Sequence, residues 1–282
     1  MPVLMSLFVF ACVLGAALLH ASWNALIKGG GSKLRGMLIM TLMQGGFGGI
    51  LALTQPWPPG AVWPWLLASG LFHSGYKLFL GFAYENGDLS RVYPIARGAA
   101  PMVVLMVGAA VLSDRINGWE YAGILVLGFG IALMARGAFT NREARRLVPL
   151  ALGSAMMTAG YSLVDGMGAR VWGDAVAYVA WLFLLDAVLF TPVVLVLRGP
   201  SLLGGTLGEW YRGSLAAAAS YGAYAIAVWA MTQAPIALVA ALRETSILFA
   251  VLIGWLVMGE RMDRTKALAA GLIVTGVVLT RI

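Results

Sequence analysis

Charge is scarce in this chain. Only 11% of its 282 residues are Asp, Glu, Lys or Arg, and 61% are hydrophobic. A typical soluble domain has about 25% charged residues. The only sizeable hydrophilic stretch runs from residue 136 to residue 146. This composition leaves no room for a soluble domain and predicts an integral membrane protein, with the lipid bilayer as its surroundings.

Cysteine and catalytic motifs are equally scarce. The single cysteine, Cys12, cannot form an intrachain disulfide, and no His/Cys cluster has the spacing of metal ligands, so we expect no metal and no cofactor. The chain has no HExxH, GxSxG or paired-aspartate signature and no glycine-rich nucleotide loop. We therefore do not expect an enzyme. An intramembrane enzyme that uses His20 and His73 as acid and base is the remote alternative.

Apolar runs recur along the whole chain, each long enough for a helix to cross a bilayer. We expect ten, at approximately 5–27, 34–54, 61–84, 91–112, 118–136, 147–168, 174–197, 211–232, 235–258 and 265–281. The hydrophilic stretch separates five of them from the other five. The sequence thus predicts an all-α integral membrane protein with ten transmembrane helices.

The fourth and ninth runs share a pattern. Arg97 precedes an apolar run that ends in Asp114-Arg115, and Arg243 precedes one that ends in Glu260-Arg261, at a constant offset of 146 residues. Five spans per half is an odd number, so homologous halves must enter the membrane in opposite directions. We predict two inverted five-helix repeats, at residues 1–138 and 147–282.

The basic residues gather in alternate loops. One side of the predicted topology has twelve and the other has three, so the positive-inside rule places both termini outside the cytoplasm. Loop charge also accounts for the net charge of +7, and no nucleic-acid partner is expected. The basic side holds Lys28, Lys33, Arg35, Arg136, Arg142, Arg145, Arg146, Arg198, Arg212, Arg261, Arg264 and Lys266, and the other side holds Arg115, Arg170 and Arg281.

Polar side chains inside the predicted spans are the candidates for function. A charge in the bilayer costs roughly 2.5–3.5 kcal/mol on insertion scales, so it is rarely there without a role. Arginine binds carboxylate or phosphate bidentately, and aromatic walls suit an uncharged side chain. The residues predict a site for a small zwitterionic or anionic solute. The expected substrate-binding residues are His20, Trp23, Asn24, Tyr76, Lys77, Arg97, Tyr161, Tyr224 and Arg243.

Four acids lie in or near the spans: Glu85, Asp165, Asp186 and Glu244. A buried carboxylate can carry a proton or neutralise a buried cation. We favour neutralisation, and protons stay a candidate coupling ion.

Two prolines, Pro94 and Pro101, bracket Arg97. Proline removes a helical hydrogen bond, so a bent fourth span is a candidate gate. Arg97 also follows Arg91, and snorkelling toward one membrane face is an alternative role for it. Of the two arginines, Arg243 is therefore the preferred substrate-binding residue.

Several stretches resemble those of a known family. They are the run His20-Ala21-Ser22-Trp23-Asn24, the run from Asp88 to Arg97, and the acidic-Arg ends of the fourth and ninth spans. They resemble the EamA type of the drug/metabolite transporter superfamily, although Asp114 stands where that family typically has glutamate. The resemblance implies a multi-pass protein of the bacterial inner membrane that exports amino acids or related metabolites by alternating access without ATP.

The resemblance does not fix the substrate, the direction of transport, the coupling ion or the oligomeric state. A flippase for lipids or lipid-linked head groups would use the same inverted helices around a basic cavity. It is the alternative function.

Overall fold

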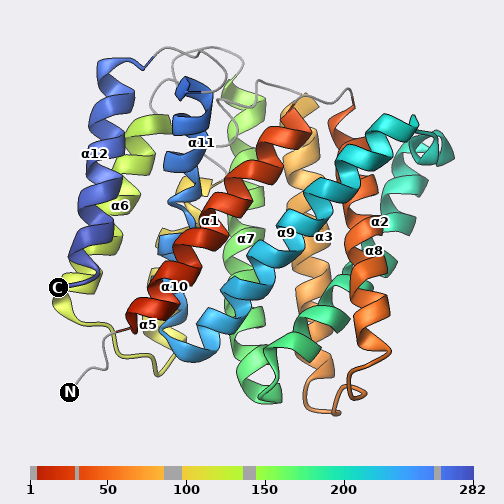
Figure 1. The fold of residues 1–282 in the computed structure, drawn as a ribbon, viewed down its shortest axis with the longest axis horizontal. Helices are drawn as coiled ribbons and strands as arrows, with labels where there is room; N and C mark the ends of the chain where they lie inside the picture. The colour runs from red at the N-terminus through yellow and green to blue at the C-terminus, as the bar shows by residue number, and fades with distance from the viewer. Residues whose placement is uncertain (1–4, 29–31, 86–96, 136–143, 257–261) are drawn as a thin grey trace.

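The structure is a computed structural model that describes residues 5–28, 32–85, 97–135, 144–256 and 262–282 (Figure 1). Within these ranges the chain is all-α, with no strand. The helices are α1 (Leu7–Lys28), α2 (Lys33–Ala52), α3 (Trp63–Glu85), α5 (Ala100–Val111), α6 (Gly118–Ala135), α7 (Ala144–Trp172), α8 (Ala175–Arg198), α9 (Leu207–Gln233), α10 (Ile236–Arg243), α11 (Ser246–Leu256) and α12 (Arg264–Leu279), with a short 3-10 turn at Pro200–Leu203.

These helices account for the ten predicted spans. The fourth span ends in α5, the ninth consists of α10 and α11 together, and each of the other spans is one helix. Five segments of the described chain are long and apolar enough to cross a bilayer: Leu7–Ile27, Leu34–Ala52, Ala175–Arg198, Leu207–Gln233 and Ile236–Leu256. The predicted ends differ by a few residues. Among the described ends, two differ by four residues. Helix α9 begins at Leu207 and not at 211, and α7 continues past residue 168 to Trp172, which places Arg170 on a helix.

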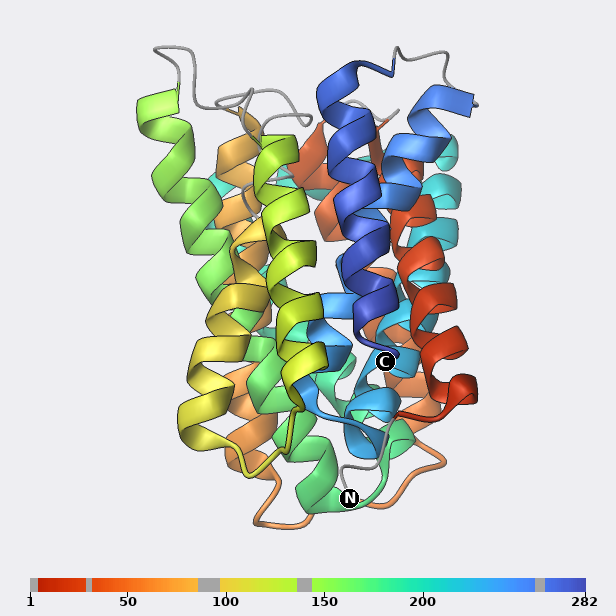
Figure 2. The ribbon, with the colours of Figure 1, turned by 90° about the vertical axis from the view of Figure 1, so that its left-hand side faces the viewer.

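The helices pack in a reciprocal pattern. Helix α3 packs on α7 and α1 on α9, while α2 packs on α8 and α6 on α12. The counterparts five spans apart are α1 and α7, α2 and α8, α3 and α9, and α6 and α12. If each helix is replaced by its counterpart, the α3–α7 pair becomes the α9–α1 pair, and the α2–α8 and α6–α12 pairs stay the same. Helices α1 and α7 also run in opposite directions (Figures 1 and 2). Both observations are expected of inverted repeats, and the boundaries at 138 and 147 stay a prediction.

The fourth and ninth spans are both interrupted near their arginines. In the ninth, α10 ends at Arg243 and α11 begins at Ser246, with a turn at Glu244 and Thr245 between them. In the fourth, a bend at Ala99 separates Arg97 from α5. Ala99 and Thr245 have the same offset of 146 residues as the two arginines. The sequence predicts one helix for the ninth span, whereas the structure has two helices with a turn between them.

Glycines allow α6 and α12 to approach closely. A Cβ atom added to Gly276 would lie 2.6 Å from the backbone nitrogen of Leu127 and 2.7 Å from the carbonyl oxygen of Gly123. Neither atom can move without the helix that carries it. Contact of two backbones through small residues is typical of packing between membrane helices.

We expect Gly276→Ala to lower the free energy of unfolding by about 1–3 kcal/mol, the range for inserting a methyl group into a close-packed contact. Gly271→Ala on the same helix is the matched control, because nothing lies within 4 Å of a Cβ atom there. Thermal unfolding of the purified protein in detergent measures both. Equal melting temperatures for the two variants would contradict close contact at Gly276.

Candidate substrate site

A cavity lies between the helices near the middle of the bundle. The centre of a water molecule can occupy about 30 Å³ of it. At ~15 Å³ for each water, this space holds about two water molecules. Seven helices contribute, because the inward faces of α1, α2, α3, α7, α8 and α9 meet around the end of α10. The lining residues are His20, Trp23, Met40, Gln44, His73, Tyr76, Lys77, Tyr161, Phe183, Ser220, Tyr224 and Arg243.

Arg243 presents its guanidinium to this cavity. It is the last residue of α10, a helix whose eight residues are all buried. Its guanidinium carbon lies 4.9 Å from the ring centroid of Tyr224, a cation–π contact. Within the described residues Arg243 forms no hydrogen bond and no ion pair. A cation that is 8% exposed and lines a cavity has donors available for a solute.

Sequence reasoning missed three lining residues, Met40, Gln44 and Phe183, of which Gln44 is the polar one. Its side chain is buried, and its Oε1 atom has no hydrogen-bond partner in the described part of the chain. A buried acceptor without a partner costs about 1–3 kcal/mol. The signal was present, because an amide in an apolar run is unusual, but the neighbouring glycines favoured a packing role for this stretch.

Lys77 also lines the cavity, but its charge is neutralised. Its Nζ atom donates to Asp186 Oδ2 and, at 2.7 Å, to Thr41 Oγ1. Both members of the ion pair are buried, and Phe190 covers the ammonium with a centroid distance of 5.1 Å. Asp186 thus neutralises a cation, one of the two roles expected for the acids.

Arg97 is neutralised in the same way. Its Nη1 atom donates to Glu244 Oε1 at 3.2 Å, and both side chains are buried. Its Nη2 atom contacts the ring of His20, whose Nδ1 atom lies 3.2 Å from Trp23 Nε1. Glu244 follows Arg243 in sequence but pairs with Arg97, which is buried in the bundle.

Asp165 differs from Asp186 and Glu244 because no lysine or arginine of the described residues contacts it. The carboxylate is fully buried. Tyr178 Oη donates to Oδ1 at 3.0 Å, Tyr224 Oη donates to Oδ2, and His73 Nε2 lies 3.0 Å from Oδ2. The His73 ring stacks on Tyr161, with centroids 4.1 Å apart. Polar side chains of α3, α8 and α9 therefore meet at this carboxylate of α7.

Comparison with known proteins decides the family. Residues 146–282 match the model of the EamA-like transporter family. The second half of the chain therefore belongs to this family. The protein is an EamA-type membrane transporter of the drug/metabolite transporter superfamily, as the motifs of the first, fourth and ninth spans predicted.

One solved structure, described as "Crystal structure of protein", is similar over almost the whole length. It has a TM-score of 0.77 and 20% sequence identity, and the match covers 96% of this chain and 97% of that one. At this identity the likeness shows a shared fold. No curated protein matches the chain.

Some predicted site residues of the EamA-type transporter lie outside the cavity lining. Asn24 donates from Nδ2 to the carbonyl oxygen of His20 at 2.8 Å, which occupies its amide within its own helix. Pro101 lies in the first turn of α5, where proline removes no helical hydrogen bond. Pro94 is outside the described residues, so the proposed gating role of the two prolines stays a prediction.

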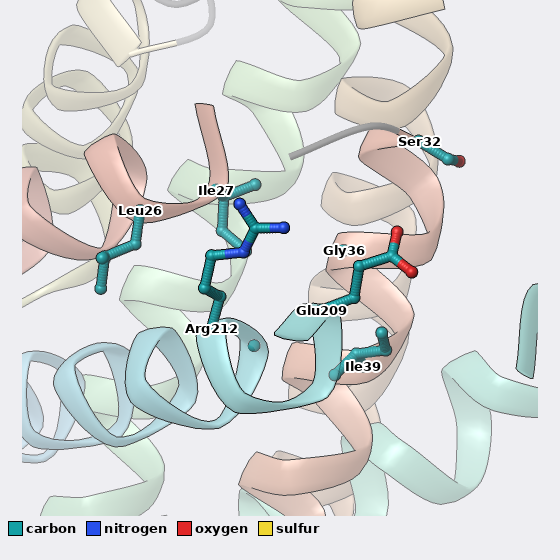
Figure 3. Close-up of a pocket in the computed structure, with 8 residues that line it drawn as sticks. Leu26, Ile27, Ser32, Gly36, Ile39, Glu209 and Arg212 are labelled. Carbon is teal, nitrogen blue, oxygen red and sulfur yellow. The ribbon is translucent and has the colours of Figure 1, made fainter. Parts of the chain in front are cut away.

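A second, outer hollow lies between the upper ends of α1, α2 and α9 (Figure 3). Arg212 projects between the hydrophobic residues Leu26 and Ile27 on one side and Glu209 on the other. Glu209 forms an ion pair with Arg35 at 3.7 Å. The outer hollow is separate from the central cavity and provides control positions for the experiments below.

Proposed function

We propose that this transporter carries small carboxylate solutes of the amino-acid class across the cell inner membrane by alternating access, in the direction of export. One observation carries the proposal. Lys77 and Arg243 line the cavity, and Arg97 contacts the lining residue His20. Lys77 and Arg97 are paired with acids, whereas Arg243 has no acidic partner among the described residues. A carboxylate bound to Arg243 would form charge-assisted hydrogen bonds in a site shielded from water.

The rest of the lining fits an amino acid. The Oε1 atom of Gln44 is an acceptor without a partner, and it can accept a hydrogen bond from the ammonium group. Aromatic rings form apolar walls for an uncharged side chain. They belong to Trp23, Tyr76, Tyr161, Phe183 and Tyr224.

The size of the cavity supports a mechanism in which helices move. Space for about two waters is smaller than any amino acid. A solute can bind only when helices around the cavity separate, as alternating access requires. The interruptions at Ala99 and at Glu244–Thr245 are points where the fourth and ninth spans can bend.

Charge placement supports the orientation. Helices α2 and α12 begin, and α8 ends, at the upper end of the bundle in Figure 1. The residues at these helix ends are Lys33, Arg264 and Arg198, and the loops that join helices at this end carry most of the basic residues of the sequence. The positive-inside rule places that end in the cytoplasm. Both termini then lie outside the cytoplasm.

Removal of Arg243 is the test. We expect Arg243→Ala to weaken binding of L-phenylalanine at least tenfold, because hydrogen bonds to charged groups contribute about 1.5–3 kcal/mol. Binding is measured by calorimetry on the purified protein and transport by uptake into proteoliposomes. Arg212→Ala, in the outer hollow, is the matched control and should behave as wild type.

Two results would count against the proposal. Wild-type binding and transport by Arg243→Ala would make this arginine structural. Displacement of the amino acid by a soluble lipid head group such as phosphoethanolamine, at lower concentration than by other amino acids, would favour the flippase.

A further inference from the structure

Among the residues that the structure describes, the buried lysine and arginine side chains around the cavity are equal in number to the buried acidic ones. Two ion pairs account for four of them and leave one arginine and one aspartate outside these pairs. Lys77 is neutralised by Asp186, and Arg97 by Glu244. Of the charged residues that the structure describes in and beside the cavity, Arg243 and Asp165 remain.

Arg243 and Asp165 both contact Tyr224. The guanidinium of Arg243 covers the tyrosine ring, and the tyrosine hydroxyl donates to the carboxylate of Asp165. If Asp165 carries its charge and His73 is neutral, the positive charge of Arg243 offsets the negative charge of Asp165 before a solute binds.

A bound anion would upset this balance. Its carboxylate would take the positive charge of Arg243, leaving one net negative charge on Asp165 inside the bundle. An uncompensated charge at this depth is costly, and the cheapest remedy is a proton. A zwitterion brings its own positive charge, so it leaves the balance unchanged.

We propose that the Asp165–His73 pair takes up one proton when the transporter binds an anionic solute and releases it with the solute. The inference rests on the proposed function, since it needs Arg243 to bind the carboxylate. The proton comes from water on the side where the solute binds and returns to water on the side where it leaves. One N–H or O–H bond forms and later breaks, and the net charge moved is zero.

The surroundings of the pair suit this role. His73 is the titratable group in contact with Asp165 whose side-chain type changes charge between pH 5 and pH 8. Four tyrosines and one arginine surround the pair. Two of the tyrosines donate to the carboxylate of Asp165, and the other two lie against the imidazole of His73. The five residues are Tyr178 on α8, Tyr224 on α9, Tyr161 on α7, Tyr76 on α3 and Arg243 on α10. Within the described residues no lysine or arginine contacts the Asp165 carboxylate, whereas Asp186 and Glu244 each have a basic partner, so Asp165 is the acid without a fixed cation beside it.

The experiment compares two ligands that differ only in the ammonium group, L-phenylalanine and 3-phenylpropionate. Their dissociation constants are measured by calorimetry from about pH 5.5 to 7.5, in two buffers of different ionisation enthalpy, which reports the protons bound. For 3-phenylpropionate we expect one proton per ligand and a Kd that rises about tenfold per pH unit. L-Phenylalanine should bind with almost no proton uptake.

Asp165→Asn should bind 3-phenylpropionate more tightly than wild type and without proton uptake, because Arg243 is then unbalanced. His73→Gln keeps a donor to the carboxylate and should shift the pH range of proton uptake. Glu209→Gln, in the outer hollow, is the control and should keep wild-type pH dependence. Wild-type pH dependence in both Asp165→Asn and His73→Gln would overturn the proposal. Failure of wild type to bind either ligand, or wild-type binding by Arg243→Ala, would instead reject the proposed function.

Discussion

Replacing Lys77 by methionine is expected to destabilise the protein by about 3–5 kcal/mol, the cost of leaving one partner of a buried ion pair alone. Asp186 has no exposed surface, and its Oδ1 atom already has no hydrogen-bond partner in the described residues. Without Lys77, its Oδ2 atom would lose its cation as well. Methionine fills similar space, so the loss reflects charge and not a cavity.

The double variant Lys77→Met, Asp186→Asn separates charge from packing. It removes both charges, and we expect it to recover most of the lost stability, since replacing a buried ion pair by neutral groups is often close to neutral. Thermal unfolding of the three proteins in one detergent measures the effect. A double variant as unstable as Lys77→Met would show that the lysine stem, and not its charge, is what the bundle needs.

Replacing Arg170 by alanine is expected to lower the free energy of unfolding by about 1.5–3 kcal/mol, the range for hydrogen bonds to charged groups. Arg170 donates to both carboxylate oxygens of Asp114, at 2.7 and 3.2 Å. It also donates to the carbonyl oxygens of Met231 and Ala234, at 2.8 and 2.9 Å. The side chain thus ties the ends of α5, α7 and α9 together at the lower end of the bundle in Figure 1.

Arg170→Lys tests the geometry of this contact. Lysine keeps the charge but lacks the planar fork that reaches four oxygen atoms, so we expect it to recover only a minor part of the stability. The losses of Arg170→Ala and Asp114→Asn should also be less than additive in the double variant, because the two residues form one contact. Additive losses would mean that the two side chains act independently.

The spans and their polar faces could be predicted from the sequence because both are local properties. A run of about 20 apolar residues is a membrane helix wherever it packs. His73 and Lys77 share a helix face by spacing alone. The match between Arg97 and Arg243 was visible for the same reason, as a repeat along the chain. These local patterns led to the family and to most of the cavity lining.

The break in the ninth span was not predicted, because its sequence lacks the usual signals. The fourth span has two prolines near its arginine, whereas no proline or glycine lies between residues 236 and 253. In the structure, the hydroxyl of Thr245 donates to the carbonyl oxygen of Leu242 at 2.7 Å, and the next helix starts at Ser246. Such local side-chain bonds compete with helical ones, but sequence alone does not show when they prevail.

By itself the sequence determined that this protein is a ten-span transporter with buried arginines, acids and aromatic residues. Only the tertiary structure decided the partners: Glu244 pairs with Arg97 and not with its neighbour Arg243, and Asp165 meets His73 and two tyrosines from three other helices. The reason is physical. A charge in a medium of low dielectric constant must find its partner across helices, and the packing of those helices decides which side chains come within reach.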